Sequence, residues 1–330
     1  MGQQRNAAIW YAQDGYDPAA KGINGRRVAG DSFLRGFLRH ADVDEFVFLS
    51  KTSIELEPVR QLAAKLRPDR ALRGASMIRP KDISPVSTLF YPSPNYAAEC
   101  WRRGPYGQAA WALCGITHTT STAAVMQGMF DLRMAPVAPW DAVICTSTAV
   151  QASVLHQMEL IDDHISAQFG TKAQTRPLFP VIPLGVHCAD FAPDPANTLR
   201  ARLGAGPKDV IFTTIARLTP HEKFDPLPIY LAMQAAQLVL KGQKLHIAFS
   251  GQVRDDHSRA VFTQGASALM PDVGFTLLDG GNPADRKAAL SGADVFLFLI
   301  DNIQETFGLA PIEAMAAGLP LLVSDWDGMK

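Results

Sequence analysis

Short apolar runs alternate with polar loops and with longer segments in which apolar residues recur three and four positions apart, beginning at Ala7. This alternation is typical of a parallel sheet whose strands are joined by crossover helices. Helices are expected at Gly30–His40 and Ala149–Gln157. The strands expected in the first half are Ala7–Gln13, Glu45–Ser50, Val86–Tyr91, Ala110–Thr117, Asp141–Thr146 and Leu178–Leu184.

The alternation lapses between His187 and Lys208, where proline, glycine and aspartate dominate. We therefore predict an N-terminal domain over residues 1–190, a hinge over 191–208 and a C-terminal domain over 209–330. Asp225 and Asn282, each followed by proline, are expected to begin helices of the second domain, and Gly318 to end one. The strands expected there are Val210–Ala216, Leu245–Ser250, Val273–Leu278, Val295–Ile300 and Leu319–Ser324.

Composition supports two globular domains and excludes several classes of protein. At roughly 150 residues per domain, 330 residues correspond to two units, and 47% apolar residues can build their cores. Thirty-one basic against 32 acidic residues give a net charge of -1 and no field for nucleic acid. No apolar run approaches the roughly 18 residues of a membrane span, and no signal peptide pattern is present. We expect a cytoplasmic protein with at most peripheral contact with the inner face of the membrane, and unpaired cysteines.

Ligands of open parallel sheets bind beyond the carboxyl ends of the strands. In the second half, Arg217 and Lys223 lie six residues apart directly after the first expected strand. Two cations at that position can hold a diphosphate without a metal ion, the guanidinium as a fork and the ammonium as a point charge. The alternative is that both are solvated surface charges.

The segment from Glu305 to Glu313 combines a loop carboxylate, a glycine and a helix start. Gly308 permits a ligand to approach the backbone, and a helix beginning near Leu309 offers N–H groups to a phosphate. Glu313 lies among apolar helix residues, where an unpartnered carboxylate costs several kcal/mol. The vicinal hydroxyls of a ribose are one suitable partner, and a neighbouring arginine or solvent is the other.

These residues resemble glycosyltransferase family 4. The resemblance rests on two glutamates with seven residues between them, the intervening Phe-Gly-Leu-Ala-Pro-Ile, the upstream Ala-Arg-Leu with its lysine, and Val-Ile-Pro-Leu-Gly-Val at 181–186. It runs from about Gly22 to the last residue and implies the GT-B fold, two Rossmann-like doubly wound domains facing a cleft, with retaining, metal-independent chemistry. It implies that Glu313 binds the donor ribose, Glu305 lies near the donor sugar, and Arg217 and Lys223 hold the diphosphate. Phe307, Gly308 and Leu309 are expected to complete the donor site.

The first half contributes two weaker candidates. Gly22-Ile-Asn-Gly25 is not a dinucleotide-binding fingerprint, but it is similar to the glycine-rich loop of the family that faces the diphosphate. His118 follows an expected strand and is similar in placement to a histidine of the family that contacts the donor sugar. The alternatives are an ordinary strand-to-helix turn and a structural hydrogen-bonding histidine.

Other motifs carry no chemistry in this interpretation. Asp325-Trp-Asp327 spells D-x-D but lacks further oxygen ligands, so we interpret it as a loop, and Asp255-Asp256 as solvated. Cys145 has no adjacent base that would make it a nucleophile. We therefore expect neither a metal ion nor a cofactor.

The function predicted from the sequence is transfer of a sugar from a nucleotide diphosphate sugar to a sugar, a lipid-linked or another small acceptor, with retained configuration. His118 and Glu305 are the predicted catalytic residues. The alternatives are a GT-B epimerase or phosphorylase and a truncated, non-catalytic nucleotide-sugar-binding protein. The second domain is expected to be incomplete at its C-terminus, because the family normally continues beyond a fifth strand.

Overall fold

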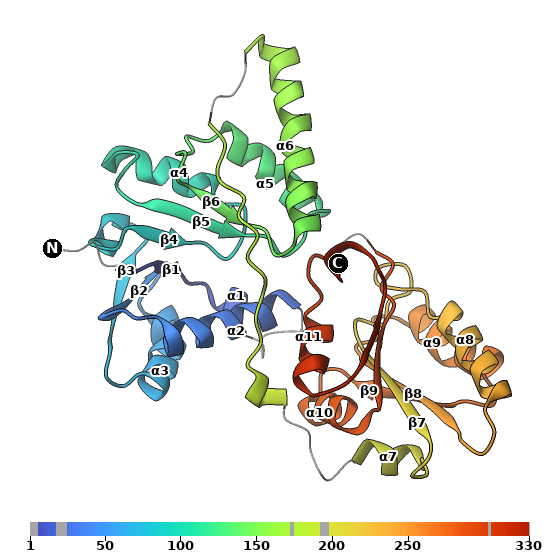
Figure 1. The fold of residues 1–330 in the computed structure, drawn as a ribbon. Helices are drawn as coiled ribbons and strands as arrows, with labels where there is room; N and C mark the ends of the chain where they lie inside the picture. Colours follow the sequence, from blue (N-terminus) through green and yellow to red (C-terminus); the bar gives the residue numbers. More distant parts are fainter. Residues whose placement is uncertain (1–5, 18–24, 172–174, 192–197, 303–304, 330) are drawn as a thin grey trace. The chain divides into compact units, whose positions relative to one another are not determined.

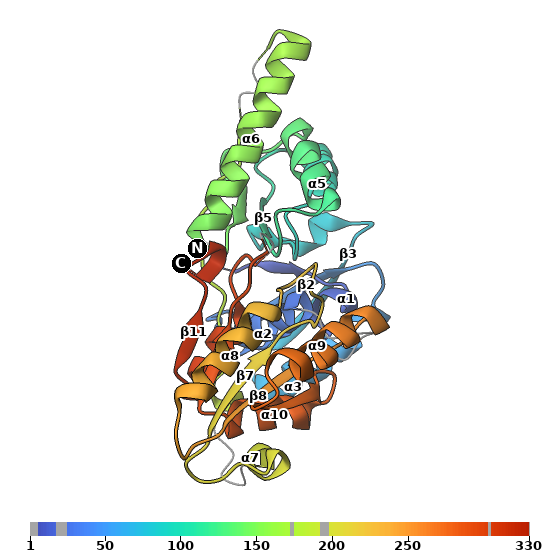
Figure 2. The ribbon, with the colours of Figure 1, turned by 90° about the vertical axis from the view of Figure 1, so that its right-hand side faces the viewer.

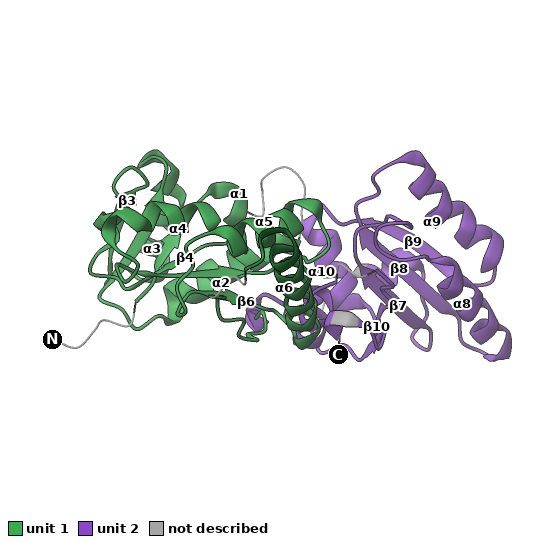
Figure 3. Ribbon diagram, turned by 90° about the horizontal axis from the view of Figure 1, so that it is seen from above, with its two compact units in different colours: residues 1–185 green, residues 186–330 purple. Residues whose placement is uncertain are grey.

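The computed structural model describes residues 6–17, 25–171, 175–191, 198–302 and 305–329. Two compact units divide the chain, residues 1–185 and 186–330, coloured separately in Figure 3. The division lies five residues before the boundary predicted from the sequence. The predicted hinge also contains helix α7 (Thr198–Leu203), whose Leu199 packs into the second unit.

Unit 1 is built on a six-stranded parallel sheet with the order β3-β2-β1-β4-β5-β6. Its helices lie on both sides of the sheet (Figure 1). The strands are β1 (Ala8–Trp10), β2 (Glu45–Ser50), β3 (Ala71–Ser76), β4 (Thr88–Phe90), β5 (Ala112–Ile116) and β6 (Ala142–Ile144). The helices are α1 (Gln13–Tyr16), α2 (Gly25–His40), α3 (Glu57–Leu66), α4 (Ala97–Arg103), α5 (Ala123–Met134) and α6 (Thr148–Phe169).

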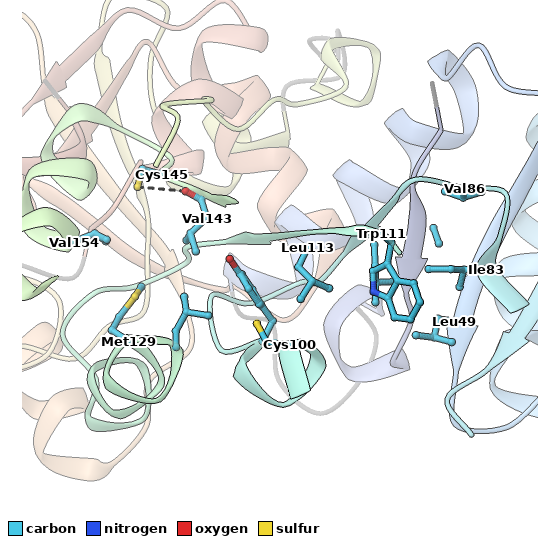
Figure 4. Packing of buried hydrophobic residues seen from close by; sticks show 14 of the residues in the cluster. Leu49, Ile83, Val86, Cys100, Trp111, Leu113, Met129, Val143, Cys145 and Val154 are labelled. Atoms are coloured by element: carbon cyan, nitrogen blue, oxygen red, sulfur yellow. Dashed lines mark hydrogen bonds between the residues drawn. The ribbon is translucent and has the colours of Figure 1, made fainter. Parts of the chain in front are cut away.

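Two apolar layers sandwich this sheet because successive strand residues point to opposite faces. Phe46 and Phe48 of β2 pack with α1, α2 and α3, whereas Val47 and Leu49 pack into the layer that contains residues of α4, α5 and α6. Figure 4 shows this second layer, including Leu113 of β5. Both faces of the sheet are therefore buried.

The strand predicted at Leu178–Leu184 does not form, and the prediction was wrong. Only isolated bridges occur there, from Leu178 to Ala142 and from Val181 to Cys145. Pro180 and Pro183 lack the N–H groups that a continuous ladder requires. The segment therefore lies beside β6 as an extended chain with interrupted pairing.

Unit 2 is a five-stranded parallel sheet with the order β11-β10-β7-β8-β9. Phe249 and other β-strand residues pack with α8 and α9 on one face, and Ala248 packs with α7 and α10 on the other (Figures 1 and 2). The strands are β7 (Val210–Ile215), β8 (Leu245–Gly251), β9 (Gly274–Asp279), β10 (Val295–Phe298) and β11 (Leu321–Val323). The further helices are α8 (Leu227–Val239), α9 (Asp256–Leu269), α10 (Pro283–Gly292) and α11 (Leu309–Ala316).

Helix ends in unit 2 follow local chemistry. Asn282 caps α10, accepting a hydrogen bond from the N–H of Ala284 at 2.9 Å, with Pro283 in the first turn. Gly318 follows α11 with a φ of 80°, a conformation that glycine adopts without strain. α8 begins at Leu227, two residues after Asp225, where the sequence predicts its start, and the Asp225 side chain accepts from the N–H of Leu227 at 3.0 Å.

Candidate functional site

The loop after β7 folds back on itself and places Lys223 at the carboxyl end of the sheet. The N–H of Lys223 donates to the carbonyl of Thr219 at 2.9 Å, which closes a turn. Phe224, the next residue, is buried against Phe249 and Phe262. This aromatic packing holds the loop in place and so positions the backbone of Lys223, from which its side chain extends.

Lys223 and Glu305 meet although 82 positions separate them in the chain, and their side chains form an ion pair. The two side chains are 16% and 14% exposed, so the pair is shielded but reachable from solvent. The Nζ atom also lies 5.7 Å from the centre of the Phe298 ring. The side chain of Asn302 donates to the carbonyl of Lys223 at 2.7 Å and ties the loops after β7 and β10 together.

Arg217 lies on the same loop but has a different partner. Its side chain is 48% exposed, and Nη1 donates to Glu222 at 3.1 Å. Glu222 also accepts from Nη1 of Arg254 at 2.7 Å. The two predicted diphosphate ligands, Arg217 and Lys223, therefore belong to separate ion pairs.

A cavity of about 670 Å³ opens at the carboxyl ends of β7, β8 and β9. Arg217 therefore borders a recess rather than a flat surface. Two more arginines of the lining, Arg254 and Arg259, were not singled out from the sequence, because only folding brings these loops together. The lining residues are Arg217, Thr219, Gly251, Gln252, Val253, Arg254, Arg259, Leu277, Leu278 and Asp279.

Gly308 turns the chain from the loop after β10 into α11. Its φ is 80°, and among the described residues no side chain caps the helix, whose first residue is Leu309 as the sequence predicts. The N–H groups of a helix's first turn have no partners within the helix, and the helix dipole is positive there. Phe307 is half-buried beside Gly308, which is itself buried. The N–H of Gly328 donates to the carbonyl of Glu305 at 3.1 Å and holds the residues after β11 against this loop.

Glu313 lies in α11 and is 1% exposed. Nη2 of Arg286, from α10, forms an ion pair with its Oε2. Burial raises the pKa of the Glu313 carboxyl, while the charge and hydrogen bond of Arg286 act to lower it. Of the two partners that the sequence leaves open, the structure shows the arginine, which lies 27 positions earlier in the chain.

The candidates of unit 1 lie at the carboxyl side of its own sheet. His118 follows β5 and is half-buried, and burial together with the charge of Arg26 lowers the pKa of its imidazole to about 4. Gly25 begins α2, and the next two residues, Arg26 and Arg27, pair with Asp14. Gly22 lies outside the described residues.

The motifs set aside in the sequence have structural explanations. Asp255 caps α9, accepting from the N–H of Ser258 at 2.7 Å. Burial raises the pKa of the Cys145 thiol to about 11, which disfavours a nucleophilic thiolate. Over the described ranges, no three His, Cys, Asp or Glu side chains group as metal ligands, and no helix is long and apolar enough to cross a membrane.

Comparisons with known proteins agree with this architecture. Residues 196–330 match the model of the family described as Glycosyl transferases group 1. HepE of Anabaena, solved with UDP and glucose, superposes with a TM-score of 0.62 at 14% identity, covering 98% of this chain and 82% of that one. The trehalose-6-phosphate synthase OtsA superposes with a TM-score of 0.57 at 13% identity, covering 98% and 85%. The fold is GT-B.

A curated relative covers part of the GT-B chain. The D-inositol 3-phosphate glycosyltransferase of Nocardia farcinica (strain IFM 10152) is 28% identical over 158 residues, which are 46% of this chain and 33% of that protein. The match thus spans about a third of the relative's length. The segment that matches the family model contains Arg217, Lys223, Glu305 and Glu313, whereas Gly25 and His118 precede it.

Proposed function

We propose that this GT-B chain transfers a sugar from a nucleotide diphosphate sugar to a small acceptor, as a member of glycosyltransferase family 4. The observation that carries the proposal is the Lys223–Glu305 pair, which joins the loops after β7 and β10 just before α11. That arrangement lies within the segment that matches the group 1 glycosyltransferase model. The solved structures of HepE with UDP, with UDP and glucose, and with UDP-glucose make a uridine diphosphate sugar the first donor to test.

In the proposed mechanism, electrostatics drives the departure of the diphosphate. The ammonium of Lys223 and the N–H groups at the start of α11 stabilise the negative charge that develops on the leaving oxygen. Arg217 exchanges Glu222 for a phosphate oxygen at the rim of the cavity. We propose that these groups suffice without a metal ion.

Retention of configuration follows in this proposal from attack by an acceptor hydroxyl on the face that the diphosphate leaves. The bond from the anomeric carbon to the phosphate oxygen breaks, the bond to the acceptor oxygen forms, and the hydroxyl proton passes to the departing phosphate oxygen. Retaining glycosidases instead place a second carboxylate where it can attack the sugar. Glu305 is already engaged by Lys223, so we assign it to holding the lysine and contacting the donor sugar rather than to forming a covalent intermediate. The pKa of His118 is about 4, so its imidazole is neutral at pH 7. We propose that it hydrogen-bonds to a hydroxyl of the donor sugar, either as donor or as acceptor.

Transfer is tested by incubating the full chain with UDP-glucose, ADP-glucose or GDP-mannose and a panel of sugar acceptors. We expect a glycosylated product with the anomeric configuration of the donor, as read by NMR. An epimerase would instead alter the donor without an acceptor, and a phosphorylase would need inorganic phosphate. Absence of donor binding and turnover across the panel would overturn the proposal.

Lys223→Ala tests the site itself. We expect a loss of about 10- to 150-fold in kcat/KM, the equivalent of one hydrogen bond to a charged group at about 1.5–3 kcal/mol. Lys241→Ala, on the exposed residue two positions after α8, is the matched control and should retain full activity. Circular dichroism melting shows whether the fold is intact. Full activity of a folded Lys223→Ala enzyme would remove Lys223 from the site.

A further inference from the structure

The contact between Arg286 and Glu313 joins two helices that lie on different crossovers of unit 2. Arg286 belongs to α10, between β9 and β10, and Glu313 to α11, between β10 and β11. The carboxylate is almost completely buried, while the arginine side chain retains 22% of its exposure. A guanidinium therefore reaches from the solvent side into the apolar surroundings of α11.

Glu313 depends on this partner for its charge. An ionised carboxylate buried without a counter-charge costs several kcal/mol, and in practice such a group takes up a proton instead. The neighbouring residues of α11 are Ile312 and Ala314, which offer no side-chain donor. Burial already raises the pKa of Glu313, and Arg286 is the group that opposes the rise.

The position of Arg286 is fixed by the start of its helix. Asp285 accepts a hydrogen bond from the N–H of Asp279 at 2.9 Å and also pairs with Arg202, which ties the first turn of α10 to the end of β9. Asp279 lines the cavity at the carboxyl ends of the strands. Arg286 therefore belongs to a helix whose first turn is hydrogen-bonded to a residue of the cavity wall.

The guanidinium of Arg286 bonds to Glu313 through one of its nitrogen atoms. Nη2 contacts Oε2, whereas the buried Nε–H has no hydrogen-bond partner among the described residues. A two-bond fork would use both donors on the two carboxylate oxygens. Here one oxygen, Oε2, is engaged from the side of α10.

We propose that Arg286 is a positioning residue that keeps Glu313 ionised and oriented, so that ribose recognition by the donor site is a property of the pair and not of the glutamate alone. The inference rests on the proposed function and deepens it. Arg286 acts on the ligand through Glu313, which accepts hydrogen bonds from the vicinal hydroxyls. A nucleoside diphosphate that lacks one of these hydroxyls should lose affinity only while the pair is intact.

The test compares ribo- and deoxyribonucleotides. UDP, ADP and GDP and their 2′-deoxy forms are titrated calorimetrically against the wild-type chain, Arg286→Met and Glu313→Gln. For the best-bound base, we expect the wild type to prefer the ribonucleotide by at least about tenfold. Both variants should reduce this ratio toward one, and the double variant should reduce it no further, because both act on one contact.

Controls separate positioning from general damage. Lys287→Met removes a positive charge from the exposed neighbour on α10 and should preserve the ratio. Arg286→Lys retains the charge without the planar fork, so its ratio should fall between those of the wild type and Arg286→Met. A purely structural role would change thermal stability without changing the preference for ribose.

The outcomes are distinct. If the wild type binds none of the three diphosphates, the proposed function itself fails. If it binds and discriminates, but a folded Arg286→Met keeps the wild-type ratio, the positioning role is overturned. If Arg286→Met does not fold, Arg286→Gln is measured instead, because glutamine retains a hydrogen-bond donor without the charge. A wild-type ratio of ribo- to deoxyribonucleotide affinity in that variant also overturns the inference.

Discussion

Carboxylates accompany the cations that the sequence assigns to the donor. Lys223 pairs with Glu305, and Arg217 pairs with Glu222. In the proposed function, a diphosphate would therefore share or displace these carboxylates. The pairing holds long, flexible side chains in place, which would lower the entropy lost when the proposed ligand binds.

His118 gives a pH-dependent prediction. Its pKa in the folded chain is about 4, against an ordinary 6.5, so between these values the unfolded chain binds a proton that the folded chain excludes. The stability of unit 1 should therefore fall as the pH is lowered through this window, by about 1–3 kcal/mol from this residue.

His118→Asn should remove the part of the acid destabilisation that His118 causes. The measurement is the free energy of unfolding of the wild type and of the variant from pH 7 to pH 4. Arg26 is the charged group identified as acting on this imidazole. His164→Asn, on the exposed part of α6, is the matched control. Parallel wild-type and His118→Asn profiles would contradict the prediction.

The site residues that sequence could indicate are those whose role depends on local order along the chain. A loop carboxylate, a glycine and a helix start follow one another from Glu305 to Leu309, and the structure has that order. The partners could not be predicted in the same way. Arg286 meets Glu313 from another crossover, so nothing in the spacing of either segment indicates the contact.

At the scale of elements, strands were predictable where both faces are buried. β2 contains the apolar run Phe-Val-Phe-Leu and β8 the run Ile-Ala-Phe, and both strands were expected within one residue of their observed bounds. β3 was missed because Ala-Leu-Arg-Gly-Ala-Ser has no such run. It forms because all six residues pair with β2, and because Arg73 bonds to Glu45 at 2.8 Å across that pair.

Gly308→Ala is expected to destabilise unit 2 through the start of α11. An added Cβ would meet Met329 and Pro311 at ordinary distances of 3.5 and 3.6 Å, so the cost is backbone strain at a φ of 80°. That strain amounts to about 1–2 kcal/mol and should lower the melting temperature by a few degrees.

Gly185→Ala is the matched control, because Gly185 is exposed, has open space around an added Cβ and does not have a positive φ. Alanine there should be neutral or stabilising by about 0.4–1 kcal/mol. Equal melting temperatures for Gly308→Ala and the wild type, in differential scanning calorimetry, would show that the turn tolerates a side chain.

At the scale of the whole molecule, each unit of the GT-B chain has its own core, and unit 1 contains a buried polar centre. Arg103 and Asp141 are both 0% exposed and joined by two hydrogen bonds of 2.7 Å. Asp141 also accepts from the N–H groups of Leu113 and Ala138, each at 2.8 Å. One carboxylate thus connects β5, α4 and the segment before β6.

Asp141→Ala should destabilise unit 1 by about 3–5 kcal/mol, because it leaves the Arg103 guanidinium buried without a counter-charge. Tryptophan fluorescence during urea unfolding is a suitable measurement, since Trp10, Trp101, Trp111 and Trp140 all lie in unit 1. Asp131→Ala, on the exposed side of α5, is the control. A shift in the urea midpoint no larger than the control's would mean that the arginine finds other partners.

The strand order of unit 2 has a consequence for biosynthesis. β7 pairs with β8 on one side and with β10 on the other, yet β10 begins at Val295, long after β7 ends at Ile215. While the ribosome adds the intervening residues, one edge of the central strand has no native neighbour, and an open edge of this kind recruits strands from other polypeptides. A nascent chain paused within this interval therefore exposes a strand edge that a chaperone could cover.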